Sequence, residues 1–412
     1  GDCRPARVDA APTPTPARAE PTARTEPTAQ RQGSIEGTLL RGGTSRGLYV
    51  TPDQLPAAGD RRDELLIELF GTPDPLQIDG IGGGNSHTSK VMIVSDSDRP
   101  AADIDYTFGQ VGIDTAVVDW SGNCGNLTSG VGVFAILSGL IDAEEPSTEV
   151  CLYNTNTGTY VDQEIPVADG GPRVRGDLRV GGIPGTGARS DSYFRDPGGA
   201  VTGRLLPTGS RTESLRVDGD DYTVSIVDAA NPNVFLRARD LGLDGTELPE
   251  ELDDPDLLSR LELLRGAACE RLGLVDDRRD AADERAAVPQ IAVVSAPQSY
   301  QRVSGGRVDA DDIDITARIV TTQTPHHSYA TTGAMCLAAA TRLEGTLPAT
   351  FARGPDSTEG PIDVTIGHPQ GTITIGVETA TRDGDPAIDR VRVGRTARRL
   401  VEGEMYYRRA LE

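Results

Sequence analysis

The pattern of apolar and polar positions predicts a chain built mainly of β-strands, with two unusually apolar helices. In the first half, apolar runs indicate strands at 34–50, around a glycine-rich turn, and at 90–95 and 102–118. Helical spacing of the apolar residues predicts a helix at 61–70. The segment 127–140 (LTSGVGVFAILSGL) is apolar on every side and rich in small residues, which is typical of a helix buried within a fold.

The second half of the chain repeats this order of elements. A helix is predicted at 257–272, and a second small-residue helix at 330–343 (ATTGAMCLAAATRL). The strands expected around them are 215–227, 291–295, 313–321, 362–366 and 372–379. Because each half combines strands with a buried helix rich in alanine and glycine, the pattern predicts two similarly built α/β domains.

Length and composition divide the chain further. Its 412 residues suit two domains of ordinary size. Residues 1–33 consist largely of Ala, Pro, Thr, Arg and Glu, which cannot bury enough apolar surface to offset chain entropy, so we expect a disordered tail there. The predicted domains are 34–172 and 173–394, and the C-terminal segment 395–412 is expected to return to the first domain.

The formal net charge of −23 excludes some classes of partner. Nucleic acids and anionic membranes are bound by basic surfaces, so neither is expected as a partner. The 40 basic residues include a single lysine, Lys90, and the others are all arginine. Together with the acidic excess and only six Phe and one Trp, this composition favours a halophilic protein adapted to high salt.

Cysteine and histidine spacing argues against metal and redox chemistry. The cysteines Cys3, Cys124, Cys151, Cys269 and Cys336 are widely spaced and form no CxxC pair, which favours reduced thiols in the cytoplasm. The four histidines show no HxH or HxxxH spacing, so we expect neither a metal nor any other cofactor. The N-terminus lacks the apolar core of a signal peptide, and no apolar run is long enough to span a membrane.

The segment 80–90 (GIGGGNSHTSK) combines four glycines with small polar residues and ends in the only lysine. It is not a phosphate-binding P-loop, because that motif needs glycine directly before the lysine, where Ser89 stands. A nest of backbone N–H donors for substrate carboxylates is the alternative. Lysine can lose its proton inside a protein whereas arginine stays protonated, so we predict that Lys90 transfers the proton.

The segment 121–126 (SGNCGN) leads directly into the first apolar helix. A cysteine at a helix start gains thiolate character from the helix dipole, and the free N–H groups there bind carboxylates. Cys124 is therefore a candidate acid/base thiol. Cys336, in the second apolar helix, is a candidate second thiol of a two-base racemase, although its alanine-rich surroundings favour a core position. A Ser/His/Asp hydrolase is not expected, because no GxSxG motif occurs.

Several motifs, in order along the chain, resemble those of the PrpF family. They are RGGTSRG (41–47), GGGNSHTSKVMIV (82–94), NCGN (123–126), FRDPGGAVTGRLLPTG (194–209), VDAANPNVF (227–235), TTGAMC (331–336), HPQG (368–371) and RTARRLVEG (395–403). This family includes 2-methylaconitate cis-trans isomerase, methylitaconate isomerase and 4-oxalomesaconate tautomerase, and shares the diaminopimelate epimerase fold. The resemblance implies an α/β (α+β) fold of two pseudo-symmetric domains, each a curled mixed sheet around a central helix, with the substrate between the helix starts.

The resemblance also implies roles for individual residues. Lys90 corresponds to the proton-transfer base, and we expect Cys124 beside it as the second catalytic residue. The expected substrate-binding residues lie in the glycine-rich turns and at the starts of the two apolar helices: Thr44, Ser45, Gly83, Gly84, Asn85, Asn123, Gly125, Asn126, Thr332 and Gly333.

We therefore expect a cofactor-independent isomerase that moves an allylic proton in a small unsaturated di- or tricarboxylate, giving a double-bond shift or a cis-trans isomerisation. 2-Methylaconitate, methylitaconate and 4-oxalomesaconate are all candidate substrates, and the sequence does not choose among them. Two alternatives are a two-cysteine racemase or epimerase of an amino or hydroxy acid, and a non-catalytic carboxylate-binding accessory protein. A homodimer formed through an exposed sheet edge or helix face is also an expectation.

Overall fold

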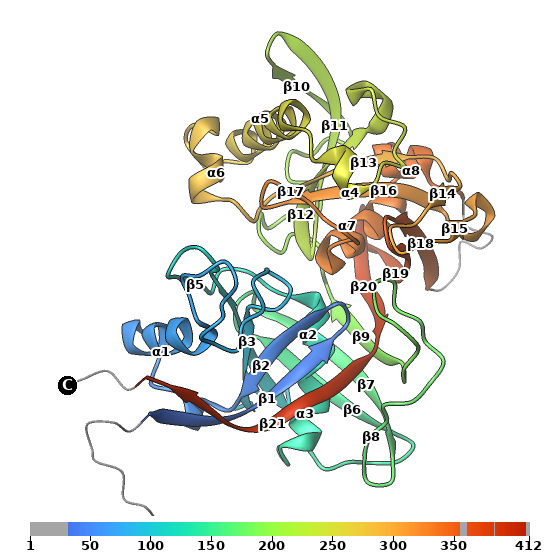
Figure 1. Ribbon diagram of the computed structural model, residues 1–412. Helices are drawn as coiled ribbons and strands as arrows, with labels where there is room; N and C mark the ends of the chain where they lie inside the picture. The colour runs from blue at the N-terminus through green and yellow to red at the C-terminus, as the bar shows by residue number, and fades with distance from the viewer. Residues whose placement is uncertain (1–31, 355–360, 383, 409–412) are drawn as a thin grey trace, which may run out of the picture.

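The computed structural model describes residues 32–354, 361–382 and 384–408. Residues 1–31 of the expected tail, including Cys3, lie outside this range, whereas Gly33 already belongs to the first strand. Figure 1 shows the described chain as two lobes, with the first strands and the last strand in the lower lobe and the middle of the chain in the upper one.

Strands of the first half follow the alternation expected for sheets with one buried face. In β4 (Ile104–Val111) most alternate side chains are buried. β3 (Lys90–Asp96) is instead buried from Lys90 to Val94, because Met92 and Val94 face one apolar cluster while Val91 and Ile93 face another. The remaining elements are β1 (Gly33–Gly42), β2 (Ser45–Val50), α1 (Asp60–Phe70), β5 (Val118–Asp119), β6 (Ser147–Asn154), β7 (Thr159–Ala168), β8 (Gly171–Pro172) and β9 (Ser190–Arg195).

The second half contains the same kind of strands together with one long surface helix. That helix, α5 (Pro255–Arg271), agrees with the helix predicted at 257–272 and begins at Asp254, whose carboxylate accepts a hydrogen bond from the amide of Leu257. The other elements are β10 (Glu213–Val217), β11 (Asp220–Ala229), β12 (Asn231–Arg237), α4 (Pro249–Leu252), α6 (Ala281–Glu284), β13 (Gln290–Ser295), β14 (Tyr300–Gln301), β15 (Arg307–Val308), β16 (Ile315–Thr321), β17 (Thr324–Pro325), α8 (Leu347–Phe351), β18 (Ile362–His368), β19 (Gly371–Arg382), β20 (Asp385–Arg395) and β21 (Ala397–Tyr407).

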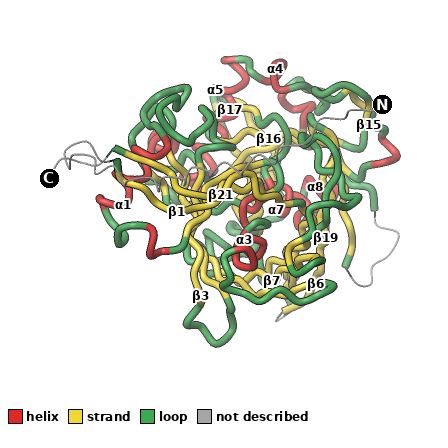
Figure 2. The backbone as a smooth tube through the Cα atoms, turned by 60° about the horizontal axis from the view of Figure 1, so that its bottom comes forward, coloured by secondary structure: helices red, strands yellow, loops and turns green. Residues whose placement is uncertain are grey.

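Both predicted apolar helices are present and lie inside the curled strands (Figure 2). The first consists of α2 (Gly125–Thr128) and α3 (Val131–Leu137), joined by Ser129 and Gly130 in right-handed helical conformation. The second is α7 (Thr331–Thr341), in which every residue up to Ala340 is buried. Burial on all sides explains why these two segments carry no polar face.

Small residues allow the strands to approach the first of these helices closely. A Cβ atom on Gly132 would lie 2.6 Å from Cδ1 of Ile165, and one on Gly130 would lie 2.5 Å from Cδ2 of Leu40. Any larger side chain would push the surrounding strands outward, because protein interiors are packed too densely to absorb it.

Strands from the two halves belong to one hydrogen-bonded sheet. Within the described residues every strand except β14 and β15 is connected through this sheet. β9 pairs with β7 on one side and β20 on the other, and β21 pairs with β1 along its length. The division of the chain after residue 172 therefore stays a prediction. No helix of the described part of the chain is long and apolar enough to cross a membrane.

Replacing Phe134 by alanine should lower the free energy of unfolding by about 3–5 kcal/mol, since it removes a buried ring from the centre of α3. Urea unfolding followed by circular dichroism measures this loss. Val401→Ala is the control, because Val401 is 53% exposed on β21 and its truncation should change the free energy by less than about 0.5 kcal/mol. Equal effects of the two substitutions would contradict the buried-helix core.

Candidate active site

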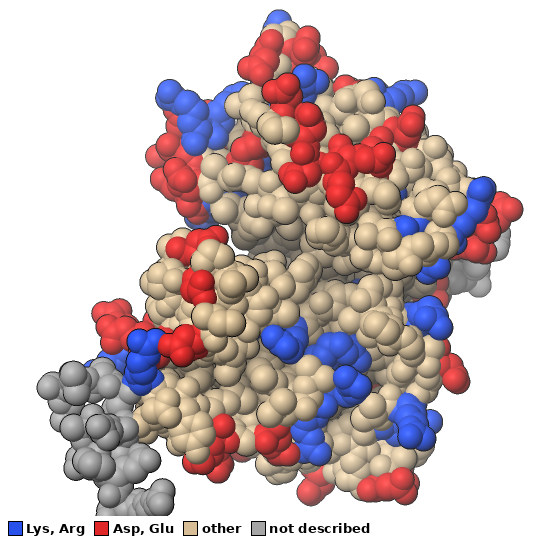
Figure 3. Space-filling view, viewed as in Figure 1, with Lys and Arg blue, Asp and Glu red and all other residues tan. Residues whose placement is uncertain are grey.

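A cavity of about 160 Å³ lies where the starts of the two apolar helices meet. Its walls come from the beginnings of β2, β3, α2, β13 and α7, so both lobes contribute to it. Figure 3 shows the surface hollowed between the lobes, with acidic side chains gathered on the upper lobe. A larger groove of about 740 Å³ crosses β6, β7, β9 and β20, but it is lined by charges of both signs and by none of the candidate residues.

Lys90 is the first residue of β3, and its side chain lines this cavity although the residue is only 9% exposed. Its Nζ donates a hydrogen bond of 2.5 Å to Oε1 of Gln110, directly across the strand pair, and lies 5.1 Å from the ring centroid of Phe108. The Gln110 amide is itself held by donating to the carbonyl of Ser89 at 2.8 Å. Lys90 takes part in no ion pair with any described carboxylate, so its amine is oriented by a neutral partner.

Cys124 lies at the start of α2 and is buried except where it lines the cavity. Its carbonyl accepts the first helical hydrogen bond, from the amide of Thr128 at 2.9 Å, so the next amides of the helix start are not used within the helix. The thiol of Cys124 and the amine of Lys90 therefore share one cavity, as predicted from the two glycine-rich segments.

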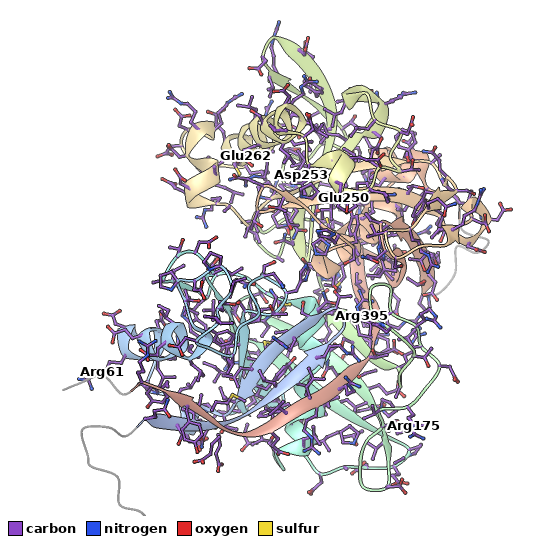
Figure 4. The ribbon with its side chains drawn as sticks, viewed as in Figure 1. Arg61, Arg175, Glu250, Asp253, Glu262 and Arg395 are labelled. Atoms are coloured by element: carbon purple, nitrogen blue, oxygen red, sulfur yellow. The ribbon has the colours of Figure 1, made fainter. Side chains whose placement is uncertain are left out.

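A buried arginine that the sequence analysis did not select links the two helix starts. Arg395, at the end of β20, donates from Nε to Oδ1 of Asn126 at 3.3 Å and from Nη2 to Oγ1 of Thr331 at 3.2 Å. Figure 4 shows it where the two lobes meet. Burial lowers the pKa of Arg395 to about 10, and among the described side chains no carboxylate pairs with it. Asn126 is further held by donating to Oγ1 of Thr44 at 3.1 Å.

The structure brings together most, but not all, of the predicted substrate-binding residues. Ser45, Asn123, Gly125, Asn126 and Thr332 line the cavity with Lys90 and Cys124. Thr44 lies behind Asn126, and Gly333 lies behind Gln290, because a Cβ on Gly333 would be 2.7 Å from the Gln290 Oε1. Both are part of the surrounding wall and not of the lining.

Gly83, Gly84 and Asn85 lie outside the lining and shape the loop that precedes Lys90. The amide of Gly84 donates to Oε1 of Gln77 at 2.9 Å, and the Asn85 side chain accepts from the amide of His87 at 3.0 Å in a local turn. Gln77 is 1% exposed and anchors this loop from inside. The glycine-rich segment therefore positions Lys90 and His87, and its Gly84 amide bonds within the loop and not to the cavity.

The second thiol of the racemase alternative does not reach the cavity. Cys336 is fully buried inside α7, donates to the carbonyl of Val227 at 3.2 Å, and has its pKa raised by burial. The residue at the start of α7 is Ala330, which has no acid/base group. The geometry thus disfavours a racemase that uses Cys124 and Cys336. No cluster of His, Cys, Asp or Glu suited to a metal occurs among the residues described.

Two histidines form a neutral part of the cavity wall. The rings of His87 and His326 meet edge to face with centroids 5.1 Å apart. Burial, followed by the charge of His87, lowers the pKa of His326 to about 3, and its Nδ1 accepts a hydrogen bond from the amide of Ser328 at 3.1 Å. Burial, followed by the charge of Lys90, also lowers the pKa of His87.

Comparison with known proteins agrees with this arrangement. The family model described as PrpF protein matches residues 32–408. The chain belongs to the PrpF family. It is 40% identical to 3-methylitaconate isomerase of Eubacterium barkeri, 37% to 2-methyl-aconitate isomerase of Shewanella oneidensis and 39% to 4-oxalomesaconate tautomerase of Pseudomonas putida. These matches cover 92%, 90% and 90% of this chain and 98%, 96% and 96% of the relatives.

Solved structures confirm the predicted fold. The crystal structure of methylitaconate-delta-isomerase matches with a TM-score of 0.78 at 40% identity, covering 91% of this chain and 96% of that one. A hydroxyproline epimerase from Agrobacterium vitis matches over 92% of this chain and 94% of its own with a TM-score of 0.53 at 12% identity, which shows a common fold. The relatives are isomerases or tautomerases, and this PrpF-family protein is an enzyme of the isomerase class.

Acidification below pH 6.5 should destabilise the protein, because half-buried His326 and buried His368, whose pKa desolvation lowers to about 3 in each case, stay neutral in the folded state. The unfolded chain takes up protons on both below their ordinary pKa of 6.5, so it binds more protons between about pH 3 and 6.5. The free energy of unfolding then falls with decreasing pH by up to about 1.4 kcal/mol per unit for each histidine.

His326→Asn should remove the contribution of one histidine to this slope, because asparagine does not titrate. The asparagine side-chain oxygen can still accept the hydrogen bond from the amide of Ser328. Urea unfolding at several pH values between about 4 and 7 measures the slope. The exposed and non-titrating Gln323 provides the control, since Gln323→Asn should leave the slope unchanged. A slope of wild-type steepness in His326→Asn would disprove the assignment of a neutral histidine.

Proposed function

We propose that this protein isomerises a small unsaturated di- or tricarboxylate by moving an allylic proton, with Lys90 as the base. The observation that carries the proposal is the single cavity in which the Lys90 amine and the Cys124 thiol face the starts of α2 and α7. The names of the relatives support three candidate substrates, 3-methylitaconate, 2-methylaconitate and 4-oxalomesaconate.

In the first step the neutral amine of Lys90 takes a proton from the carbon next to the double bond. The C–H bond breaks as the N–H bond forms, and the electron pair spreads over the allylic carbons into a conjugated carboxylate or keto group. Backbone and side-chain donors at the helix starts, among them Asn126 and Thr332, stabilise the charge that develops on oxygen.

In the second step a proton returns to the other end of the allylic system, from the Lys90 ammonium or the Cys124 thiol. The double bond has then shifted by one position and the enzyme has lost no net proton. Rotation about the former double bond, followed by return of the proton to the carbon that lost it, gives cis-trans isomerisation instead. All electrons that move come from the substrate C–H bond and its double bond, so the steps balance without an oxidant or reductant.

The surroundings of the site suit an anionic substrate. Arg395 carries a positive charge that no described carboxylate neutralises, and it holds Asn126 in the cavity wall. We also propose that the enzyme works in a salt-rich cytoplasm, because its net charge is −23 and it contains a single lysine. Its activity should therefore be assayed at both low and molar salt.

Lys90→Arg should lower kcat by at least about 1,000-fold, because arginine stays protonated and cannot act as a base near neutral pH. The ultraviolet absorbance of the conjugated substrates or products follows the reaction. Cys124→Ser should lose less activity if the thiol only assists. Near wild-type turnover by Lys90→Arg would overturn the assignment of the base, provided that circular dichroism shows a folded protein.

A further inference from the structure

The two halves of the cavity are built from strands with the same neighbours. β3 lies between β2, which runs parallel to it, and β4, which runs antiparallel. β13 likewise lies between parallel β12 and antiparallel β16. Lys90 is the first residue of β3 and Gln290 is the first residue of β13, and both side chains line the cavity. Gln290 therefore occupies the position in the second half that Lys90 occupies in the first.

Cys124, the other candidate acid/base residue of the first half, also has an unreactive counterpart at the matching position of the second half. Cys124 stands directly before α2, and Ala330 stands directly before α7. The second half of the cavity thus presents an amide and a methyl group where the first presents an amine and a thiol. An amide neither gives nor takes a proton near neutral pH, so these two positions of the second half are suited to binding the substrate and not to proton transfer.

The Gln290 side chain has hydrogen-bonding capacity that the described protein does not use. Its Oε1 is buried and has no hydrogen-bond partner within residues 32–354, 361–382 and 384–408. Gly333 leaves room for it, because a Cβ there would lie 2.7 Å from this oxygen and 2.5 Å from Cδ1 of Ile319. With Oε1 packed beside Gly333, the NH2 group is the other end of the same amide. It donates a hydrogen bond to no described residue, so it is available to a ligand in the cavity.

We propose that Gln290 binds a carboxylate of the substrate and so orients the polycarboxylate against Lys90. This inference rests on the proposed function, since it needs an anionic substrate in the cavity. A carboxylate oxygen accepts from the Gln290 NH2 group, and a polycarboxylate supplies this acceptor where the described residues supply none. A neutral donor at this position binds the carboxylate without adding a second base.

Binding of propane-1,2,3-tricarboxylate tests the role of Gln290 without any reaction, because this saturated tricarboxylate has no allylic proton. Calorimetry on the full chain should show binding by wild type and about tenfold or greater weakening in Gln290→Met, which keeps the length of the side chain but removes its hydrogen bonds. Gln301→Met is the matched control, since Gln301 is exposed on β14, and it should bind as wild type does.

Gln290→Glu separates a hydrogen-bonding role from a merely structural one. Its carboxylate repels the ligand, so binding should be weaker than in Gln290→Met near neutral pH and should recover as the pH falls and the new carboxyl group is protonated. In turnover assays Gln290→Met should raise KM more than it lowers kcat. Unchanged affinity in Gln290→Met, or a Gln290→Glu variant that binds as well as Gln290→Met at every pH, would overturn the proposal.

Failure of this inference is distinguishable from failure of the proposed function. Wild-type turnover of an unsaturated polycarboxylate combined with unimpaired ligand binding by Gln290→Met would overturn the role of Gln290 alone. Gln290-dependent binding of the tricarboxylate with no turnover of any of the three candidate substrates would overturn the reaction and keep the binding role. No binding of the tricarboxylate by wild type overturns the inference as well.

Discussion

Complete burial of two helices is the constraint on which the rest of this structure depends. A helix without a polar face must be enclosed by strands, and the strands can close around α3 and α7 only where glycine and alanine leave space. Enclosure leaves the helix starts as the places where unpaired N–H groups reach a cavity. Because both starts open into the same cavity, the packing of the core creates the site for an anion.

Arg395 connects the starts of the two buried helices, and it comes from β20, near the end of the described chain. It lies in β20, 269 residues after Asn126, and hydrogen-bonds to the start of each helix. A guanidinium that is buried without a carboxylate partner is costly on its own, and a bound polycarboxylate would supply the missing negative charge. The same residue that joins the two lobes therefore also favours an anionic ligand beside them.

Much of the fold, and two of the candidate residues that line the cavity, Lys90 and Cys124, could be predicted from the sequence for physical reasons. The two apolar helices have a pattern that only burial explains, and Lys90 stands out as one lysine among 40 basic residues. Gln110, Gln290 and Arg395 were not predicted, because glutamine and arginine are common and only the folded chain brings these three to the site. Gly83 to Asn85 lie outside the cavity lining, and Gln77, a buried residue with no distinguishing sequence pattern, accepts a hydrogen bond from the Gly84 amide in this loop.

The two halves of the cavity have similar backbones and different chemistry, and this asymmetry bears on how the proton moves. A cavity with acid/base groups on both walls can remove a proton from one face of a substrate and return one to the other, which inverts a stereocentre. Here the amine and the thiol belong to the same half, while Gln290 and Ala330 stand at the corresponding positions of the other. Removal and return from one wall suit a proton that migrates along one face of an allylic system. The two walls of the cavity thus share one backbone arrangement and differ in the side chains at matching positions.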